Sequence, residues 1–237
     1  MGLFPDAQEI TESMACLSAV ESHLADITRL SDTSTTCIVV GDGSTPRTAA
    51  LLAMRSKWRV LSVDPALQGL FDDELDPEPA QASLPREQRH KAMQKQLLMA
   101  RQRRREQREA LRKVKRLELH ACGIEQVLVS LDAHKHLVLI LPHAHVIPDI
   151  ALNSTLISPG SPMPSISIVQ LPCCKFIKHD KVCGLAPDLE YTDMSIATSR
   201  RVVRVWRDIG PAATSSHAFQ TSKSAWTAPY RQDFKRM

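Results

Sequence analysis

The sequence has 237 residues, 43% of them hydrophobic, and a formal net charge of +4. This length suits one domain with a good hydrophobic core and is cramped for two. The first twenty residues contain acids and no basic segment, and no apolar run approaches the roughly 20 residues that cross a bilayer, which argues against a leader, a transit peptide or a membrane span. Six cysteines without an evenly spaced framework favour free thiols and an intracellular protein, cytoplasmic or nuclear.

The first element that the pattern predicts is an amphipathic helix near the N-terminus. Its apolar residues repeat at intervals of three and four positions, which is the helical period. They are Ile10, Met14, Leu17, Val20 and Leu24. We expect this helix to pack beside a sheet.

A strand, a glycine turn, a helix and a second strand follow. Residues 35–40 are a short run rich in β-branched side chains that ends at Gly41, and residues 47–55 are rich in Ala and Leu. Residues 59–63 form a second strand-like run that ends at Asp64-Pro65, where proline stops regular pairing. Together they have the length of a βαβ unit.

The central part of the chain changes character twice. The stretch 71–85 is acidic and contains proline, which predicts a loop, and residues 86–116 contain no Gly or Pro, which predicts a helix over most of that range. A strand at 117–120 and a short helix at 124–131 are compatible with the pattern.

Three later runs read as strands. Residues 137–141 are continuously apolar, which is typical of a strand buried on both faces of a parallel sheet, and residues 165–171 form another. The charges in 201–207 favour a last strand at the sheet edge. The predicted fold class is therefore α/β, a doubly wound and largely parallel sheet in one domain, 1–210, with a basic helical insertion at about 86–116. The tail 211–237 lacks periodicity and is expected to be flexible.

The glycine turn carries the strongest functional signal. Gly41 and Gly43 allow the backbone to pass close to a bound cofactor, and Asp64 lies 23 residues after Gly41, where an acid commonly reaches a ribose hydroxyl. We predict that the cofactor-binding residues are Gly41, Asp42, Gly43, Ser44 and Asp64. The alternative is a tight strand–helix turn with no ligand.

The start of the following helix bears on the kind of cofactor. Thr45 is predicted to cap the helix and Pro46 to begin it, which would leave its first amides available to a ligand. A dinucleotide-binding Gly-x-Gly-x-x-Gly pattern would need glycine at position 46, so Pro46 disfavours NAD.

At these residues the sequence resembles the class I, seven-stranded, S-adenosylmethionine-dependent methyltransferases. In that family the first strand ends in acid-x-Gly-x-Gly, which corresponds here to Gly41 and Gly43, and an acid after the second strand, here Asp64, binds the adenosine ribose. The leading acid of the motif would fall on Val39. Asp42, between the glycines, either substitutes for it or faces solvent.

Residues that follow the later strands should line an active site, because ligands of open parallel sheets lie beyond the carboxyl ends of the strands. His143 and His145 follow the run 137–141 and are candidate general bases, since imidazole titrates near neutrality. The plainer alternative is a pair of loop histidines bonded to backbone. The Asp/Asn-Pro-Pro-aromatic motif of many methyltransferases that modify nitrogen is missing. The tripeptide Pro172-Cys173-Cys174 resembles a subgroup that includes a tRNA 2′-O-methyltransferase family.

The same region contains thiols and a histidine that could bind zinc. The set is Cys173, Cys174, His179 and Cys183. Adjacent cysteines rarely both bind one tetrahedral ion and no Cys-x-x-Cys is present, so small buried thiols are favoured and no metal site is predicted.

The segment 86–116 holds thirteen Lys or Arg against three Glu, so the rest of the chain is acidic. Its second half has basic residues on every helical face and almost no apolar stripe, which predicts a helix exposed to solvent that suits the phosphate backbone of RNA. The predicted RNA-binding residues are Arg101, Arg103, Arg104, Arg105, Arg108, Arg112, Lys113, Lys115 and Arg116. A solvated helix face, a localisation signal and docking on an acidic protein are the alternatives.

The function favoured by these patterns is an S-adenosylmethionine-dependent methyltransferase acting on or near RNA. The first alternative is a catalytically silent methyltransferase-like module that binds RNA or a ribonucleoprotein. It is favoured by Val39 at the motif acid position. The second is a nicotinamide-dependent oxidoreductase.

Overall fold

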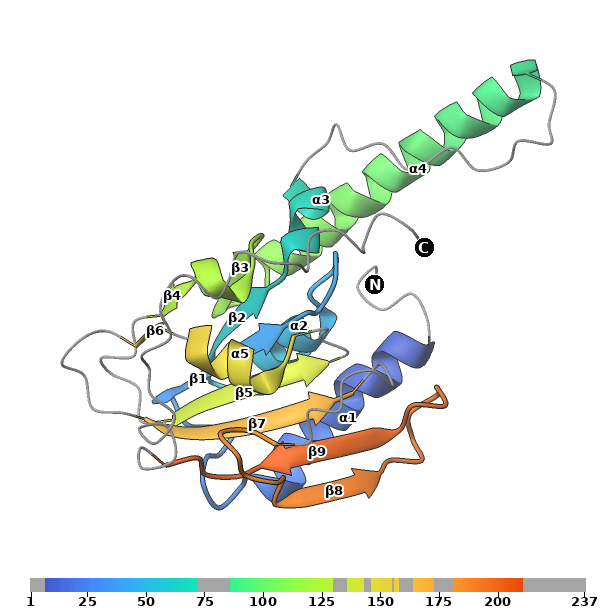
Figure 1. Ribbon diagram of the computed structural model, residues 1–237. Coiled ribbons are helices and arrows are strands. Elements are labelled where there is room, and N and C mark those ends of the chain that lie inside the picture. The colour runs from blue at the N-terminus through green and yellow to red at the C-terminus, as the bar shows by residue number, and fades with distance from the viewer. Residues whose placement is uncertain are drawn as a thin grey trace, which may run out of the picture.

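A seven-stranded sheet forms the centre of the computed structural model, which describes residues 7–71, 86–129, 136–142, 146–154, 156–157, 164–172 and 181–210 (Figure 1). The strands in spatial order are β3 (Leu117–His120), β2 (Arg59–Val63), β1 (Thr35–Val40), β5 (His136–Pro142), β7 (Ser165–Leu171), β9 (Val202–Trp206) and β8 (Leu189–Thr192). The first five are mutually parallel, and β9 is antiparallel to both of its neighbours. The predicted fold class, an α/β fold with a largely parallel seven-stranded sheet, is confirmed.

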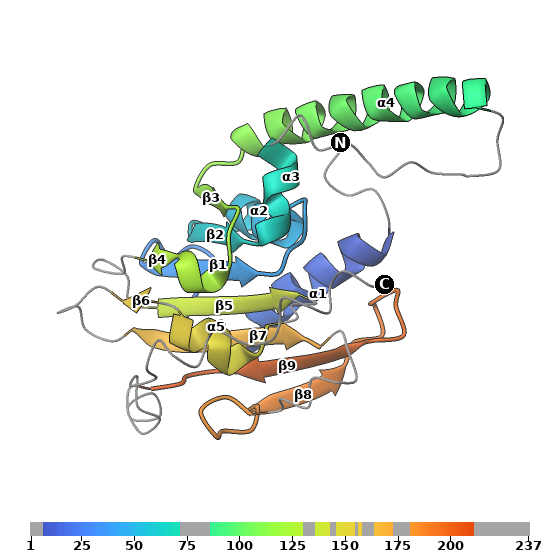
Figure 2. The same ribbon diagram turned by 45° about the horizontal axis from the view of Figure 1, so that its top comes forward.

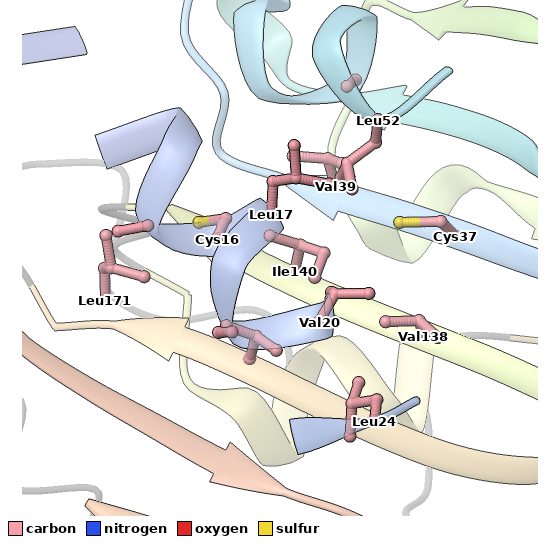
Figure 3. Packing of buried hydrophobic residues seen from close by; sticks show 14 of the residues in the cluster. Cys16, Leu17, Val20, Leu24, Cys37, Val39, Leu52, Val138, Ile140 and Leu171 are labelled. Atoms are coloured by element: carbon pink, nitrogen blue, oxygen red, sulfur yellow. The ribbon is translucent and has the colours of Figure 1, made fainter. Parts of the chain in front are cut away.

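Helices cover both faces of this sheet, because alternate residues of each buried strand point to opposite sides. Helices α1 (Ala7–His23) and α2 (Arg47–Arg55) pack on one face, against a cluster that includes Val39 and Ile140 (Figure 3). Helix α5 (Pro148–Ser154) and a 3₁₀ turn, η2 (Ile124–Gln126), pack on the other. The sheet is therefore doubly wound, as predicted.

Helix α1 packs beside the sheet as expected, and Leu17, Val20 and Leu24 of the predicted apolar set are buried. Ile10 and Met14 were predicted to face the core and are 40% and 44% exposed. The buried arc is centred on Cys16, and it consists of Ala15, Cys16, Leu17, Ala19 and Val20 together with the polar Glu12 and Ser13. Small side chains in this arc let the helix approach the strands closely, so part of the buried face consists of residues that a pattern of large apolar side chains does not mark.

The C-terminal strands differ from the prediction. The run 201–207 was expected at the sheet edge, but β9 lies between β7 and β8. The edges of the sheet are β3 and β8. Each edge strand carries a glutamate that is ion-paired with an arginine of the neighbouring inner strand, Glu118 with Arg59 at 2.7 Å and Glu190 with Arg204 at 2.6 Å.

The remaining elements are short, apart from one helix. After β2 come η1 (Pro65–Leu67) and α3 (Gln68–Phe71). The predicted helix at 124–131 is replaced by η2 and then β4 (Leu128–Val129), which pairs with β6 (Leu156–Ile157) in a separate small sheet. The loop predicted at 71–85, except Phe71, and the predicted tail 211–237 lie outside the described residues.

Helix α4 (Arg86–Arg112) extends away from the sheet, as both views show (Figures 1 and 2). It covers most of the range 86–116 and ends at Arg112. Its anchor is Leu111, which is buried in a small cluster with Ala50 of α2 and Leu70 of α3. Leu98 and Met99, further along the helix, are exposed. The part of the chain that the structure describes contains no helix of the length and apolarity that a membrane crossing requires.

Candidate functional site

The glycine turn at the end of β1 adopts a conformation that favours glycine. Gly41 and Gly43 have φ angles of +79° and +76°. The amide of Gly41 donates to the carbonyl of Val63 at 3.1 Å, which joins the ends of β1 and β2. A Cβ at Gly43 would meet no other atom within 4 Å. The backbone conformation therefore calls for glycine at 43, while the space beside it is open to a ligand.

Asp64 links the two strand ends. One carboxylate oxygen accepts a hydrogen bond from the amide of Gly43 at 2.8 Å, and the other accepts one from the amide of Ala66 at 2.7 Å. The structure thus brings the predicted ribose acid next to the predicted glycine turn. Asp64 also has a structural role that the sequence pattern did not predict.

Replacing Asp64 by Ala is expected to lower the free energy of unfolding by about 2 kcal/mol, because two backbone amides lose a charged acceptor. Asp193→Ala is the matched control. Asp193 closes a local turn with the amide of Ser195 at 2.9 Å but makes no such link between strands. Urea unfolding measures both variants. Equal losses would show that the link between the two strand ends adds no stability beyond that of a local turn.

Asp42 neither faces solvent nor stands at the end of β1. Its two carboxylate oxygens accept hydrogen bonds from the amides of Thr48 at 3.1 Å and Ala49 at 2.9 Å, in the first turn of α2. The helix begins after Pro46, and Thr45 does not cap it as predicted. The amides that were expected to be available to a ligand are therefore bound by the protein's own carboxylate.

The carboxyl group of Asp42 has a raised pKa because it is shielded from water. Desolvation raises the pKa of its carboxyl group from 3.8 to about 6. Hydrogen bonds from Ala49 and Thr48 and the nearby charge of Arg47 oppose that rise. At neutral pH the group is mostly ionised.

A pocket of about 290 Å³ lies between α1 and the glycine turn. Its lining consists of Glu9, Glu12 and Ser13 of α1, the turn residues Gly41, Asp42, Gly43 and Ser44, the α2 residues Arg47 and Thr48, and Pro142 at the end of β5. The lining thus contains three acidic residues and one arginine. Arg47 itself is ion-paired with Glu9 at 2.6 Å, and the hydroxyl groups of Ser13 and Thr48 are 3.0 Å apart.

The sequence predicted the glycine turn but not the residues of α1 and α2 that line the rest of the pocket. Gly41, Asp42, Gly43 and Ser44 line the pocket, whereas Asp64 accepts a hydrogen bond from the amide of Gly43 and is not part of the lining. The contributions of α1 and Arg47 were missed. A usable signal was the presence of polar Glu12 and Ser13 among the small apolar residues of α1.

The predicted catalytic histidines, His143 and His145, lie outside the described residues. Pro142, which precedes His143 directly, lines the pocket. Cys173, Cys174 and His179 also lie outside the described residues.

Cys183, the remaining zinc candidate, is half-buried, and its backbone amide donates to Asp149 at 2.6 Å. Burial and the neighbouring Asp149 raise the pKa of its thiol. Among the residues that the structure describes, no three His, Cys, Asp or Glu side chains gather as a metal site.

Eight of the nine predicted RNA-binding residues lie on α4 or directly after it. Arg101, Arg103 and Arg105 are exposed on α4, and Arg105 pairs with Glu109 one turn further on, at 3.2 Å. Arg104, Arg108 and Arg112 lie on the same helix, and Lys113 and Lys115 follow its end.

Arg116 is the ninth of the predicted RNA-binding residues. Its guanidinium donates to the carbonyls of Ala53 at 3.3 Å and Ser56 at 2.7 Å, so it caps the C-terminus of α2. This residue has a structural role in the fold that charge alone did not reveal.

No protein-family model and no curated protein matches the sequence. Similar solved structures include coclaurine N-methyltransferase, with 11% identity, a TM-score of 0.33, and coverage of 67% of this chain and 36% of that one. Geranyl diphosphate C-methyltransferase from Streptomyces coelicolor A3(2) has 13% identity, a TM-score of 0.37, and coverage of 72% and 54%. The 16S rRNA (adenine(1408)-N(1))-methyltransferase from Catenulisporales acidiphilia has 16% identity, a TM-score of 0.37, and coverage of 81% and 90%.

The chain thus spans about a third to a half of the length of the first two of these enzymes. The assignment of the fold rests on the strand order and strand directions of the sheet itself.

Proposed function

We propose that this chain binds S-adenosylmethionine in the pocket between α1 and the glycine turn and acts as a methyltransferase, with RNA as its substrate class. The observation that carries the proposal is the position of Asp42 at the start of α2. Its carboxylate accepts hydrogen bonds from the amides of Thr48 and Ala49. A dinucleotide would need those amides for its pyrophosphate, and Asp42 would also repel that group.

The charges around the pocket suit a cation. Glu9, Glu12 and Asp42 contribute three carboxylates to the lining and Arg47 contributes one positive charge. The methionine part of S-adenosylmethionine carries a sulfonium, an ammonium and a carboxylate group, so its net charge is positive and complements the net negative charge of this lining. The residues present therefore fit this cofactor better than they fit NAD, which supports the methyltransferase interpretation over the oxidoreductase one.

Each residue then has a definite task. The turn Gly41 to Ser44 would form the floor under the cofactor, and Asp42 and Glu12 would face its cationic groups. Asp64 is not part of the lining, so its task in this proposal is to hold the turn through the amides of Gly43 and Ala66. Bound S-adenosylmethionine supplies an electrophilic methyl group. His143 or His145, which follow the lining residue Pro142 in the sequence, would accept the proton of the substrate.

The RNA part of the proposal rests on α4. This helix projects from the sheet and presents Arg101, Arg103 and Arg105 to solvent. Such a charge distribution favours binding to the phosphate backbone with little dependence on base sequence.

A specific observation also supports a second candidate, a silent module that binds RNA without transferring a methyl group. The position of the family's motif acid is held by Val39, whose side chain is fully buried in the core. Transfer of a radiolabelled methyl group from S-adenosylmethionine to RNA separates the two. Binding of both partners without transfer would favour the silent module.

Calorimetric titration tests the cofactor directly. We expect S-adenosylmethionine to bind to the wild-type protein and NAD to give no heat of binding, because the pocket is acidic and the α2 amides are occupied. Binding of NAD, or no binding of S-adenosylmethionine at millimolar concentration, would contradict the proposal.

Gly43→Ala is expected to lower the affinity for S-adenosylmethionine about tenfold or more. A methyl group would enter the open space beside the turn, and L-residues disfavour positive φ. Gly210→Ala is the matched control, since a Cβ there also meets nothing within 4 Å and Gly210 is not among the glycines with positive φ. Thermal unfolding of both variants confirms that they fold. Similar affinities for the two would show that the turn does not contact the cofactor.

A further inference from the structure

A second pocket, of about 200 Å³, lies where α3 and β3 meet the base of α4. Its walls are largely apolar. Leu70 and Leu111, both buried, belong to the cluster that anchors α4, and Leu117 and Leu119 of β3 complete the apolar lining. The space is smaller than the roughly 300–1,000 Å³ of common small-molecule sites. It suits one planar group.

The rim of this pocket combines an aromatic ring with positive charge. Phe71, the last residue of α3, is 50% exposed, and Arg108 and Arg112 of α4 line the same opening. The basic segment contains no aromatic residue of its own, and the fold supplies one from α3. An exposed aromatic ring beside guanidinium groups is the usual platform on which an unpaired base stacks.

Positive charge continues from the pocket along the helix. Arg104, Arg108 and Arg112 are spaced four residues apart, which places them on one side of α4 at steps of about 6 Å along its axis. The first two are half-buried and the third is exposed. A polyanion that follows this row of arginines reaches the pocket at its end.

We infer that the pocket lined by Phe71 holds an unstacked nucleobase of single-stranded RNA, with the adjoining phosphates along the row Arg104, Arg108 and Arg112. The occupant follows from complementarity of charge and from the size and apolar lining of the cavity. Double-stranded RNA fits less well, because its bases are stacked and paired. The inference deepens the RNA part of the proposed function and rests on it.

The test compares a 12-nucleotide oligoadenylate with the duplex it forms with oligouridylate, by fluorescence anisotropy at several salt concentrations. Phe71→Ala should lower the affinity for the single strand about 5- to 100-fold, because one base loses its stacking partner. It should leave the affinity for the duplex unchanged. The slope of log affinity against log salt should not change, since no charge is removed. Phe71→Leu keeps an apolar side chain but no ring, so its affinity for the single strand should fall nearly as much. Met194→Ala, an exposed apolar control on a distant loop, should match the wild type.

A second variant distinguishes the contribution of the phosphate contacts from that of the stacked base. Replacing Arg104, Arg108 and Arg112 together by Gln should reduce the salt slope for the single strand by about 2, since each phosphate contact contributes about 0.7. Circular dichroism confirms that α4 is retained in each variant. A 2-aminopurine placed in the oligoadenylate should be quenched by the wild-type protein and not by Phe71→Ala.

The outcomes are distinct. Equal affinity of wild type and Phe71→Ala for the single strand, or equal losses on single strand and duplex, would overturn the nucleobase site while leaving RNA binding by α4 intact. RNA binding that neither variant changes would overturn both the pocket and the row of arginines, and would indicate a protein partner for this surface. Wild-type protein that binds no RNA at low salt would overturn this inference and the RNA part of the proposed function, whereas the S-adenosylmethionine titration tests the cofactor part separately.

Discussion

Replacing Val39 by Asp is expected to lower the free energy of unfolding by about 3 to 5 kcal/mol, even though it restores the acid of the family's motif. Val39 is fully buried and packs with Leu17 of α1 and Leu52 of α2 (Figure 3). A carboxylate there would lose its hydration and gain no charged partner, and burial of an unpaired charge has a cost of this size. Urea unfolding at neutral pH measures the change.

Val39→Ala is the control, because it removes volume without adding charge, and a loss of about 1 to 3 kcal/mol is expected from the smaller side chain. If Val39→Asp unfolds like wild type and binds S-adenosylmethionine more tightly, the side chain must reach the cofactor pocket. That result would contradict the placement of residue 39 in the core.

Acidification should stabilise the wild-type protein relative to Asp42→Asn. The folded-state pKa of Asp42 is about 6, above the ordinary value of 3.8, so the native state holds the proton more tightly than the unfolded chain. The stabilisation is fully present below pH 3.8 and is lost as the pH rises through 6. The difference in unfolding free energy between wild type and Asp42→Asn should therefore fall by up to about 3 kcal/mol between pH 4 and pH 7.

Asp26→Asn provides a control of opposite sign. A hydrogen bond and ion pair with Arg207 hold the pKa of the Asp26 carboxyl below 3.8, so its contribution is lost as the pH falls rather than as it rises. Denaturant titrations at a series of pH values give both differences. A wild-type minus Asp42→Asn difference that is independent of pH would show that Asp42 titrates normally and is well hydrated.

Apolar runs predicted the inner strands because those strands are buried on both faces. Residues 137–141 and 165–171 needed no information beyond their own composition. Strand β8 was missed, since three of its four residues are exposed and its sequence has no apolar alternation. The antiparallel direction of β9 depends on which strand it pairs with, and pairing between distant segments leaves no local pattern.

The glycine turn was predictable and its surroundings were not. Gly41, Gly43 and Asp64 belong to adjacent strands of a βαβ unit, so their proximity follows from chain order. Asp42 lies six residues before Thr48, a separation outside the usual capping patterns. The contribution of Glu9 depends on how α1 packs, and the apolar pattern predicted only part of the buried face of that helix.

The two edge strands bear on how the protein behaves at high concentration. Unpaired strand edges can recruit other chains into a growing sheet, and proteins limit this with short edges and charged side chains. Here β3 and β8 have four residues each, and each carries a glutamate held by an arginine of the strand beside it. Both edges of the described sheet are thus protected against edge-to-edge aggregation, so a loss of either ion pair would affect solubility more than folding.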